Sequence, residues 1–129
     1  MTAARTRTAT RPQNPNADAE SRLVAERVAA AGRAEALRRD VDAIVESAKG
    51  GATDDEHDAE GATVAFERAQ AMALLAETQA QIETLDQALA RVAAGTYGRC
   101  ESCGEPITPE RLAARPAATT CIRCASRRR

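Results

Sequence analysis

The sequence predicts a mainly α-helical protein, in which a long antiparallel coiled-coil hairpin precedes a small C-terminal four-cysteine zinc finger. Three observations lead to this prediction. No proline occurs from Asn16 to Glu105, so no proline would break a helix in this stretch. Two segments of this stretch repeat apolar residues at alternating spacings of four and three, as coiled coils do. Four cysteines follow as two C-x2-C pairs, a pattern typical of structural zinc sites.

The composition limits the kind of core that the chain can build. Its 129 residues suit about one domain, and Tyr97 and Phe66 are the only aromatic residues. A large globular core is therefore not expected. The formal net charge is −1, so no overall basic balance favours binding to nucleic acid or to an anionic membrane.

Residues 1–16 are expected to form a disordered arm, because they are polar, dotted with arginine and offer almost nothing to bury. The start of the chain has no apolar core for export, and no stretch approaches the ~18 apolar residues of a membrane span. A cytoplasmic protein without membrane contact is expected. Residues 1–17 lack acids and are rich in Arg and Thr, so an organellar transit peptide stays open as an alternative.

The hairpin is expected over residues 17–94. Its two helices are predicted by two seams with heptad spacing. The first seam consists of Leu23, Arg27, Ala30, Ala34, Leu37, Val41, Ile44 and Ala48. The second consists of Val64, Arg68, Ala71, Leu75, Thr78, Ile82, Leu85, Leu89 and Val92. Gly50 and Gly51 suit the end of the first helix, and Gly95 the end of the second.

The two seams fit each other in one antiparallel register. The spacings of four and three residues, read forward along the first seam, are the same as those read backward along the second. Glu56 lies at the midpoint of this register. Small residues then face larger ones, which lets the helices approach closely without aromatic residues; the pairs are Ala30 with Ile82, Ala34 with Thr78 and Ala71 with Val41. Arg27 and Arg68 break the seams and are expected to snorkel at their edge.

Two separate chains could also pair through such heptads. The glycine-bearing break at 50–61 and the single register favour folding back within one chain, so a monomer is expected.

The predicted tip, residues 50–61, concentrates negative charge at the end of a rod about 45 Å long. Its acidic residues are Asp54, Asp55, Glu56, Asp58 and Glu60, and it holds no basic residue. The alternative is a solvated loop that its charge keeps soluble. His57 is the only histidine and could sense pH or bind metal, although an exposed loop histidine usually does neither.

The four cysteines, Cys100, Cys103, Cys121 and Cys124, have the spacing C-x2-C-x17-C-x2-C. Each C-x2-C pair presents two sulfurs in a tight turn, and four thiolates leave no open position on Zn²⁺, so a structural site is expected. The intervening segment has few large apolar residues beyond Ile107 and Leu112, so metal binding would supply its stability. A rubredoxin-like iron site and a thiol switch that ejects zinc are the alternatives.

The run GTYGRCESCGEPITPERLAARPAATTCIRC, residues 95–124, resembles the C-terminal zinc finger of the DksA/TraR family of bacterial transcription regulators. The resemblance lies in the Tyr-Gly before the first pair, the Cys-Glu-Ser-Cys-Gly run and the Arg115-Pro116 step. A helical hairpin before the finger is also that family's architecture, so the resemblance extends over 17–124.

This resemblance implies a protein without enzymatic activity that binds RNA polymerase and not specific DNA sequences. The family inserts its coiled coil into the secondary channel, where acidic tip residues alter initiation, in several members together with guanosine tetraphosphate. The tip departs from the family's Asp-x-x-Asp-x-Ala pattern, because Asp55 and Asp58 fit but Glu60 occupies the alanine position. An ungapped count from the finger places His57, Glu60 and Ala62 there instead. The direction of regulation therefore stays open.

Two other functions compete with this one. A nucleic-acid-binding zinc finger would use the arginines at 99, 111, 115, 123 and 127–129, although a three-arginine end is more often a plain solvated tail. A redox sensor would use the cysteines. No Gly-rich phosphate loop and no nucleophile–His–Asp set points to an enzyme.

Overall fold

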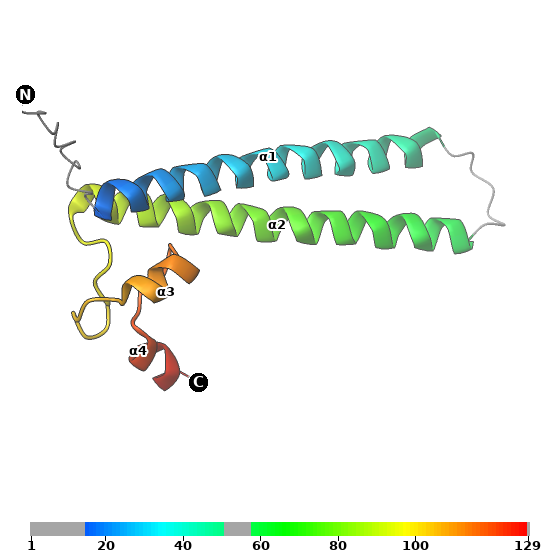
Figure 1. Ribbon diagram of the computed structural model, residues 1–129. Coiled ribbons are helices and arrows are strands. Elements are labelled where there is room, and N and C mark those ends of the chain that lie inside the picture. Colours follow the sequence, from blue (N-terminus) through cyan, green and yellow to red (C-terminus); the bar gives the residue numbers. More distant parts are fainter. Residues whose placement is uncertain (1–14, 51–57, 129) are drawn as a thin grey trace, which may run out of the picture.

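The computed structural model describes residues 15–50 and 58–128. Two long helices, α1 (Pro15–Gly50) and α2 (Asp58–Ala94), run antiparallel side by side (Figure 1). Two short helices, α3 (Pro109–Ala114) and α4 (Ile122–Arg127), belong to a small lobe beside the base of this hairpin. The predicted fold class, a helical hairpin followed by a small four-cysteine finger, is confirmed.

Both long helices begin earlier in the chain than the sequence predicts. α1 begins at Pro15, within the expected arm, and α2 begins at Asp58, within the expected tip. Proline at the first helical position is tolerated because the N–H that it lacks would have no partner there. α2 ends at Ala94, where Gly95 takes a φ of 75° and Thr96 N–H donates to Arg91 O at 2.9 Å. A left-handed glycine is a common way to end a helix.

The base half of the hairpin is the tightly packed part. Leu23, Ala30, Leu85 and Ala88 form a buried cluster, and Ile82 and Leu89 pack against it. Ala34 is buried as well. Ala30 and Ile82 therefore lie in one core layer, as the register predicts, and the small alanine side chains let the two helices approach closely.

Polar contacts between the helices follow the same register. Arg27 donates from Nη2 to Oδ2 of Asp86 at 3.2 Å, and its Nε bonds the other carboxylate oxygen. Nearer the tip, Arg33 of α1 donates to Gln81 Oε1 of α2 at 3.1 Å. Arg27 is half-buried and Arg68 exposed, which fits arginines at the edge of a seam. The hydrogen bond from Arg27 lowers the pKa of the Asp86 carboxyl.

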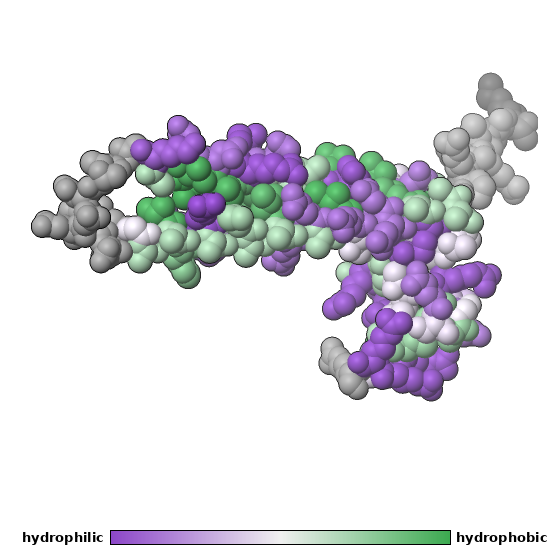
Figure 2. Space-filling view, turned by 180° about the vertical axis from the view of Figure 1, so that it is seen from behind, coloured by the Kyte–Doolittle hydropathy of each residue, from purple (hydrophilic) through white to green (hydrophobic). Residues whose placement is uncertain are grey.

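Toward the tip, the seam is more open. Val41, Ile44, Val64 and Ala71 are only partly buried, and Ala48 of the predicted seam is exposed. A groove of about 400 Å³ opens here between α1 and α2, lined in part by Leu37, Ile44 and Leu74. In Figure 2, hydrophobic residues gather along the line where the two helices meet on this part of the hairpin. The hairpin is therefore tight at its base and looser toward its tip.

Of the acidic residues predicted at the tip, Asp58 and Glu60 belong to the first turn of α2. Asp54, Asp55 and Glu56, together with His57, lie outside the described residues, as do residues 1–14 of the predicted arm and Arg129. No helix in the described ranges combines the length and the apolar character that crossing a membrane requires.

Candidate functional site

The four cysteines converge in the lobe at the base of the hairpin. Their sulfur atoms all lie within 4.8 Å of one another, and Cys103 Sγ lies 3.8 Å from Cys121 Sγ. A tetrahedral zinc ion with Zn–S bonds of about 2.3 Å separates its sulfurs by about 3.8 Å. Four soft sulfur donors at this spacing therefore fit Zn²⁺.

The first cysteine pair sits in a tight turn. Gly104 N–H donates to Cys100 O at 2.9 Å, and Gly104 takes a φ of 75°, a conformation that glycine adopts at little cost. Cys100 N–H donates in turn to Glu105 O at 2.9 Å. This turn brings Cys100 and Cys103 to the same side, as the C-x2-C spacing predicts.

The second pair is placed by the start of α4. Cys121 precedes this helix as its N-cap residue, and Ala125 N–H donates to Cys121 O at 2.9 Å. Cys124 therefore lies one helical turn after Cys121, and both sulfurs reach the cluster. Cys100 and Cys121 are buried, Cys124 is half-buried and Cys103 is exposed.

The thiols of the cluster differ in pKa. The pKa of Cys100 falls to about 6, chiefly because the backbone N–H of Cys121 stabilises its thiolate. The pKa of Cys121 is also lowered, first by the backbone N–H of Cys124. The pKa of Cys124 rises to about 12, first through its side-chain hydrogen bond with Cys121. A metal ion that binds all four sulfurs must therefore displace protons from the cluster.

A small apolar core supports the cysteines. Ile107 is buried together with Cys100 and Cys121, and Leu112 packs against them. α3 is capped by Thr108, whose Oγ1 accepts from Arg111 N–H at 3.3 Å. Ile107 and Leu112, the two large apolar residues noted between the cysteine pairs, thus both serve this core.

Comparisons with known proteins agree with this geometry. The model of the prokaryotic dksA/traR C4-type zinc finger matches residues 95–129. The finger belongs to the DksA/TraR family. Its cysteines and their spacing are those of a C4-type finger, so the DksA/TraR finger of this chain is a Zn²⁺ site.

Individual relatives match parts of the chain. The chain is 52% identical over 46 residues to the RNA polymerase-binding transcription factor DksA of Caulobacter vibrioides. These 46 residues make up 36% of this chain and 32% of that protein. The uncharacterized protein YteA of Bacillus subtilis is 38% identical over 66 residues, 28% of its length. The matched segments thus span about a third of these relatives or less.

A solved structure extends the likeness beyond the finger. The transcription factor DksA2 from Pseudomonas aeruginosa superposes with a TM-score of 0.75 and 27% sequence identity. The superposition covers 88% of this chain and 81% of that one. Hairpin and DksA/TraR finger together therefore share one architecture with DksA2.

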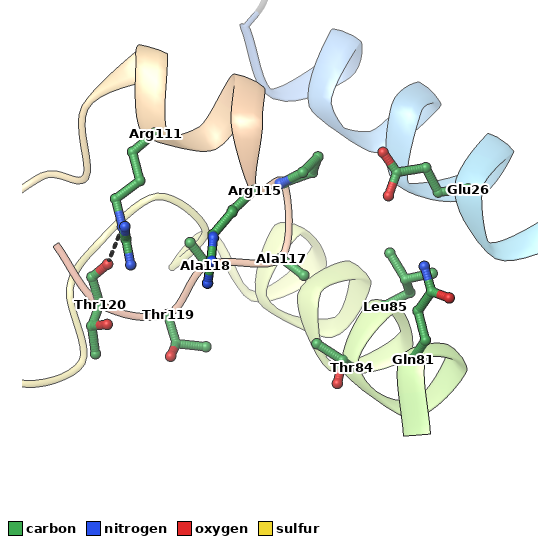
Figure 3. A pocket seen from close by; sticks show the side chains of 11 residues that line it. Glu26, Gln81, Thr84, Leu85, Arg111, Arg115, Ala117, Ala118, Thr119 and Thr120 are labelled. Atoms are coloured by element: carbon green, nitrogen blue, oxygen red, sulfur yellow. Dashed lines mark hydrogen bonds between the residues drawn. The ribbon is translucent and has the colours of Figure 1, made fainter. Parts of the chain in front are cut away.

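A cleft of about 400 Å³ lies between part of the DksA/TraR finger and the base of the hairpin. Figure 3 shows Glu26 of α1 and Gln81, Thr84 and Leu85 of α2 on one side. The finger side includes Arg115 and the segment that follows it. Arg111 turns to its own lobe, where Nε donates to Thr120 O at 2.8 Å.

Three side chains at the base of the hairpin bind the DksA/TraR finger through contacts that the sequence pattern does not predict. Tyr97 Oη donates to Pro116 O at 2.6 Å, Arg91 donates to Ala117 O at 3.3 Å, and Arg22 donates to Ala113 O at 2.9 Å. The motif that contains Tyr97 predicts no contact for its side chain. Tyr97 is the single tyrosine in a chain with almost no aromatic residues, and it lies shortly before the first cysteine pair. This position is the sequence signal for a packing role.

Proposed function

We propose that this protein regulates transcription by binding RNA polymerase and inserting the tip of its hairpin into the secondary channel. The observation that carries the proposal is the likeness to DksA2 over 88% of the chain, including the long hairpin. A hairpin of 36 and 37 helical residues measures about 55 Å along its axis. Such a rod can carry a few residues deep into a narrow channel.

The finger has a structural and not a catalytic part in this proposal. Cys100, Cys103, Cys121 and Cys124 are its proposed zinc ligands, which leave no coordination position for a substrate. We expect no enzymatic activity. With polymerase as its partner, the protein acts in the cytoplasm as a monomer and reads no DNA sequence itself.

The first test is a pull-down of purified RNA polymerase core with the zinc-loaded protein. Binding is expected at physiological salt, and its absence would contradict the proposal. Binding to nucleic acid instead, falling steeply as salt rises, would support the rival function, because phosphate contacts release counterions. One arginine assigned to that rival, Arg111, already holds the carbonyl of Thr120.

The acidic tip is proposed to produce the regulatory effect, while the hairpin sides and the finger supply most of the affinity. Clustered carboxylates in a confined site near a divalent ion interact far more strongly than in open solvent. The double variant Asp55→Asn with Asp58→Asn removes charge and nearly keeps shape. It should bind polymerase core with unchanged affinity but change transcript yield in vitro much less than the parent.

The matched control removes two exposed charges from the sides of the hairpin, through Asp42→Asn and Glu77→Gln, and should regulate like the parent. If the tip variant regulates like the parent, the tip is only a solvated loop. If it loses binding, the tip is an anchor and the proposed division is wrong. Adding guanosine tetraphosphate to the same reactions tests whether this nucleotide takes part.

A further inference from the structure

One segment of the finger, residues 113–120, faces the base of the hairpin and is named here the docking segment. Three hairpin-side groups donate to its backbone carbonyls: Arg22 from α1, Arg91 from α2 and Tyr97 from the turn after α2. Ala117 also packs against the hairpin's buried cluster. In all three hydrogen bonds the acceptor is a backbone carbonyl oxygen of the finger. These bonds therefore depend on the direction in which the carbonyls of the docking segment point.

The opposite side of the docking segment is tied to the cysteine cluster. Glu101 N–H, within the first cysteine pair, donates to Thr119 O at 2.9 Å. Arg111 Nε donates to Thr120 O at 2.8 Å, and Thr120 is itself buried directly before Cys121. The backbone of the docking segment is therefore held in place by the same turns that bring the sulfurs together.

Arg91 connects the two sides directly. Its Nη2 donates to Ala117 O, and its Nη1 lies 3.7 Å from the carboxylate of Glu101. Glu101 lies between the two cysteines of the first pair in the sequence. The Glu101 side chain is 58% exposed, but that of Arg91 is only 16% exposed, so Arg91 is better shielded from solvent than Arg27, Arg38 and Lys49 in the other ion pairs of the described helices. One side chain of α2 thus contacts both the docking segment and the metal-binding turn.

We propose that zinc occupancy and docking of the finger on the hairpin are coupled, with Arg91 and Tyr97 as the positioning residues. Closing the cysteine cluster fixes the carbonyls of the docking segment where these side chains can reach them. Because coupling is reciprocal, docking must raise zinc affinity by the factor by which zinc favours docking. This coupling is a property of the chain alone and does not depend on its binding RNA polymerase.

Hydrogen–deuterium exchange of the whole protein tests the coupling, with and without a zinc chelator. Removing zinc should speed exchange in residues 113–120 and also in the last two turns of α2, while the middle of α1 and α2 keeps its protection. Faster exchange confined to residues 98–125 would overturn the proposal, because zinc would then fold the finger without fixing it to the hairpin.

Zinc affinity provides the second test, measured by competition with a chelator. Arg91→Gln should lower zinc affinity about fivefold or more, while Arg68→Gln, an exposed position on the same helix, should leave it unchanged. Tyr97→Phe changes no charge and should lower zinc affinity in the same direction, which separates docking from simple electrostatics near the thiolates. Circular dichroism checks that each variant keeps its helices. Parent-like zinc affinity in both Arg91→Gln and Tyr97→Phe would overturn the coupling.

Discussion

Tyr97 shows how one residue can combine two environments. Its ring packs against the apolar cluster at the base of the hairpin, while its hydroxyl donates to Pro116 O at 2.6 Å. Burial raises the pKa of the Tyr97 phenol above its ordinary value of 10.0, although Arg22 and Arg91 nearby oppose this shift. The folded state therefore favours the neutral phenol, which is also the form that can donate.

The pKa of Tyr97 predicts a loss of stability in alkali. Because the folded pKa lies above the unfolded one, its contribution is complete below about pH 10 and is lost as pH rises through the folded pKa. With one tyrosine and no tryptophan, the phenolate absorbance reports this group alone. Its midpoint should be higher in the native protein than in denaturant, and an equal or lower native midpoint would contradict the assignment.

The variant Tyr97→Phe removes the hydroxyl and leaves Pro116 O without this donor. It should lower the free energy of unfolding by about 0.5–1.5 kcal/mol at neutral pH, as measured by urea titration. Because the variant lacks the phenol, it should also lack the part of the stability loss at alkaline pH that is due to this group.

At the scale of the helices, the alanines of the base half set the distance between α1 and α2. Ala30 and Ala88 are fully buried, so a larger side chain at either position would have to enter the contact between the helices. The tip half, with its half-buried Val41 and Ile44, has weaker packing. The hairpin is thus expected to open from the tip, because buried apolar contacts are fewest there.

The variant Ala30→Leu tests this close approach. A leucine at this position must push the helices apart or adopt a strained conformation, which should cost about 1–3 kcal/mol. Ala29→Leu places the same side chain at the neighbouring exposed position and should leave stability nearly unchanged, since alanine and leucine both favour helices. Thermal unfolding followed by circular dichroism compares the two, and equal melting temperatures would contradict the packing described here.

At the scale of the whole molecule, the hairpin and the finger draw their stability from different sources. The hairpin has its own apolar cluster of Leu23, Ala30, Leu85 and Ala88. The finger buries little besides Ile107 and its cysteines. A lobe of this size needs a metal ion to fold, as small metal-binding domains generally do.

Removal of zinc should therefore unfold the finger and keep most of the helical structure. α3 and α4 contribute six residues each, against 36 and 37 in α1 and α2, so the far-ultraviolet circular dichroism should fall by only about a seventh. The same loss should follow acidification, since the cysteine ligands must be deprotonated to bind zinc. Loss of most of the helical signal on chelation would show that the hairpin cannot fold without the metal.

The sequence alone determined the hairpin, its register and the cysteine cluster. These features depend on periodicity and spacing: heptads place one face of each helix inward, and C-x2-C pairs bring two sulfurs together wherever they occur. Leu23, Ala30 and Leu85, predicted as seam residues, are indeed buried. Gly95 ends α2 as predicted, because its left-handed conformation is a local property of the chain.

Only the tertiary structure decided how the finger meets the hairpin. Ala88 lies outside the predicted seam, yet it is fully buried in the cluster against which Ala117 packs. The bonds from Arg22, Arg91 and Tyr97 end on backbone carbonyls, and every residue carries such a carbonyl, so no side-chain pattern marks the acceptors. Contacts of this kind arise when two separately predictable parts pack together, and they follow from the position of the backbone and not from local sequence.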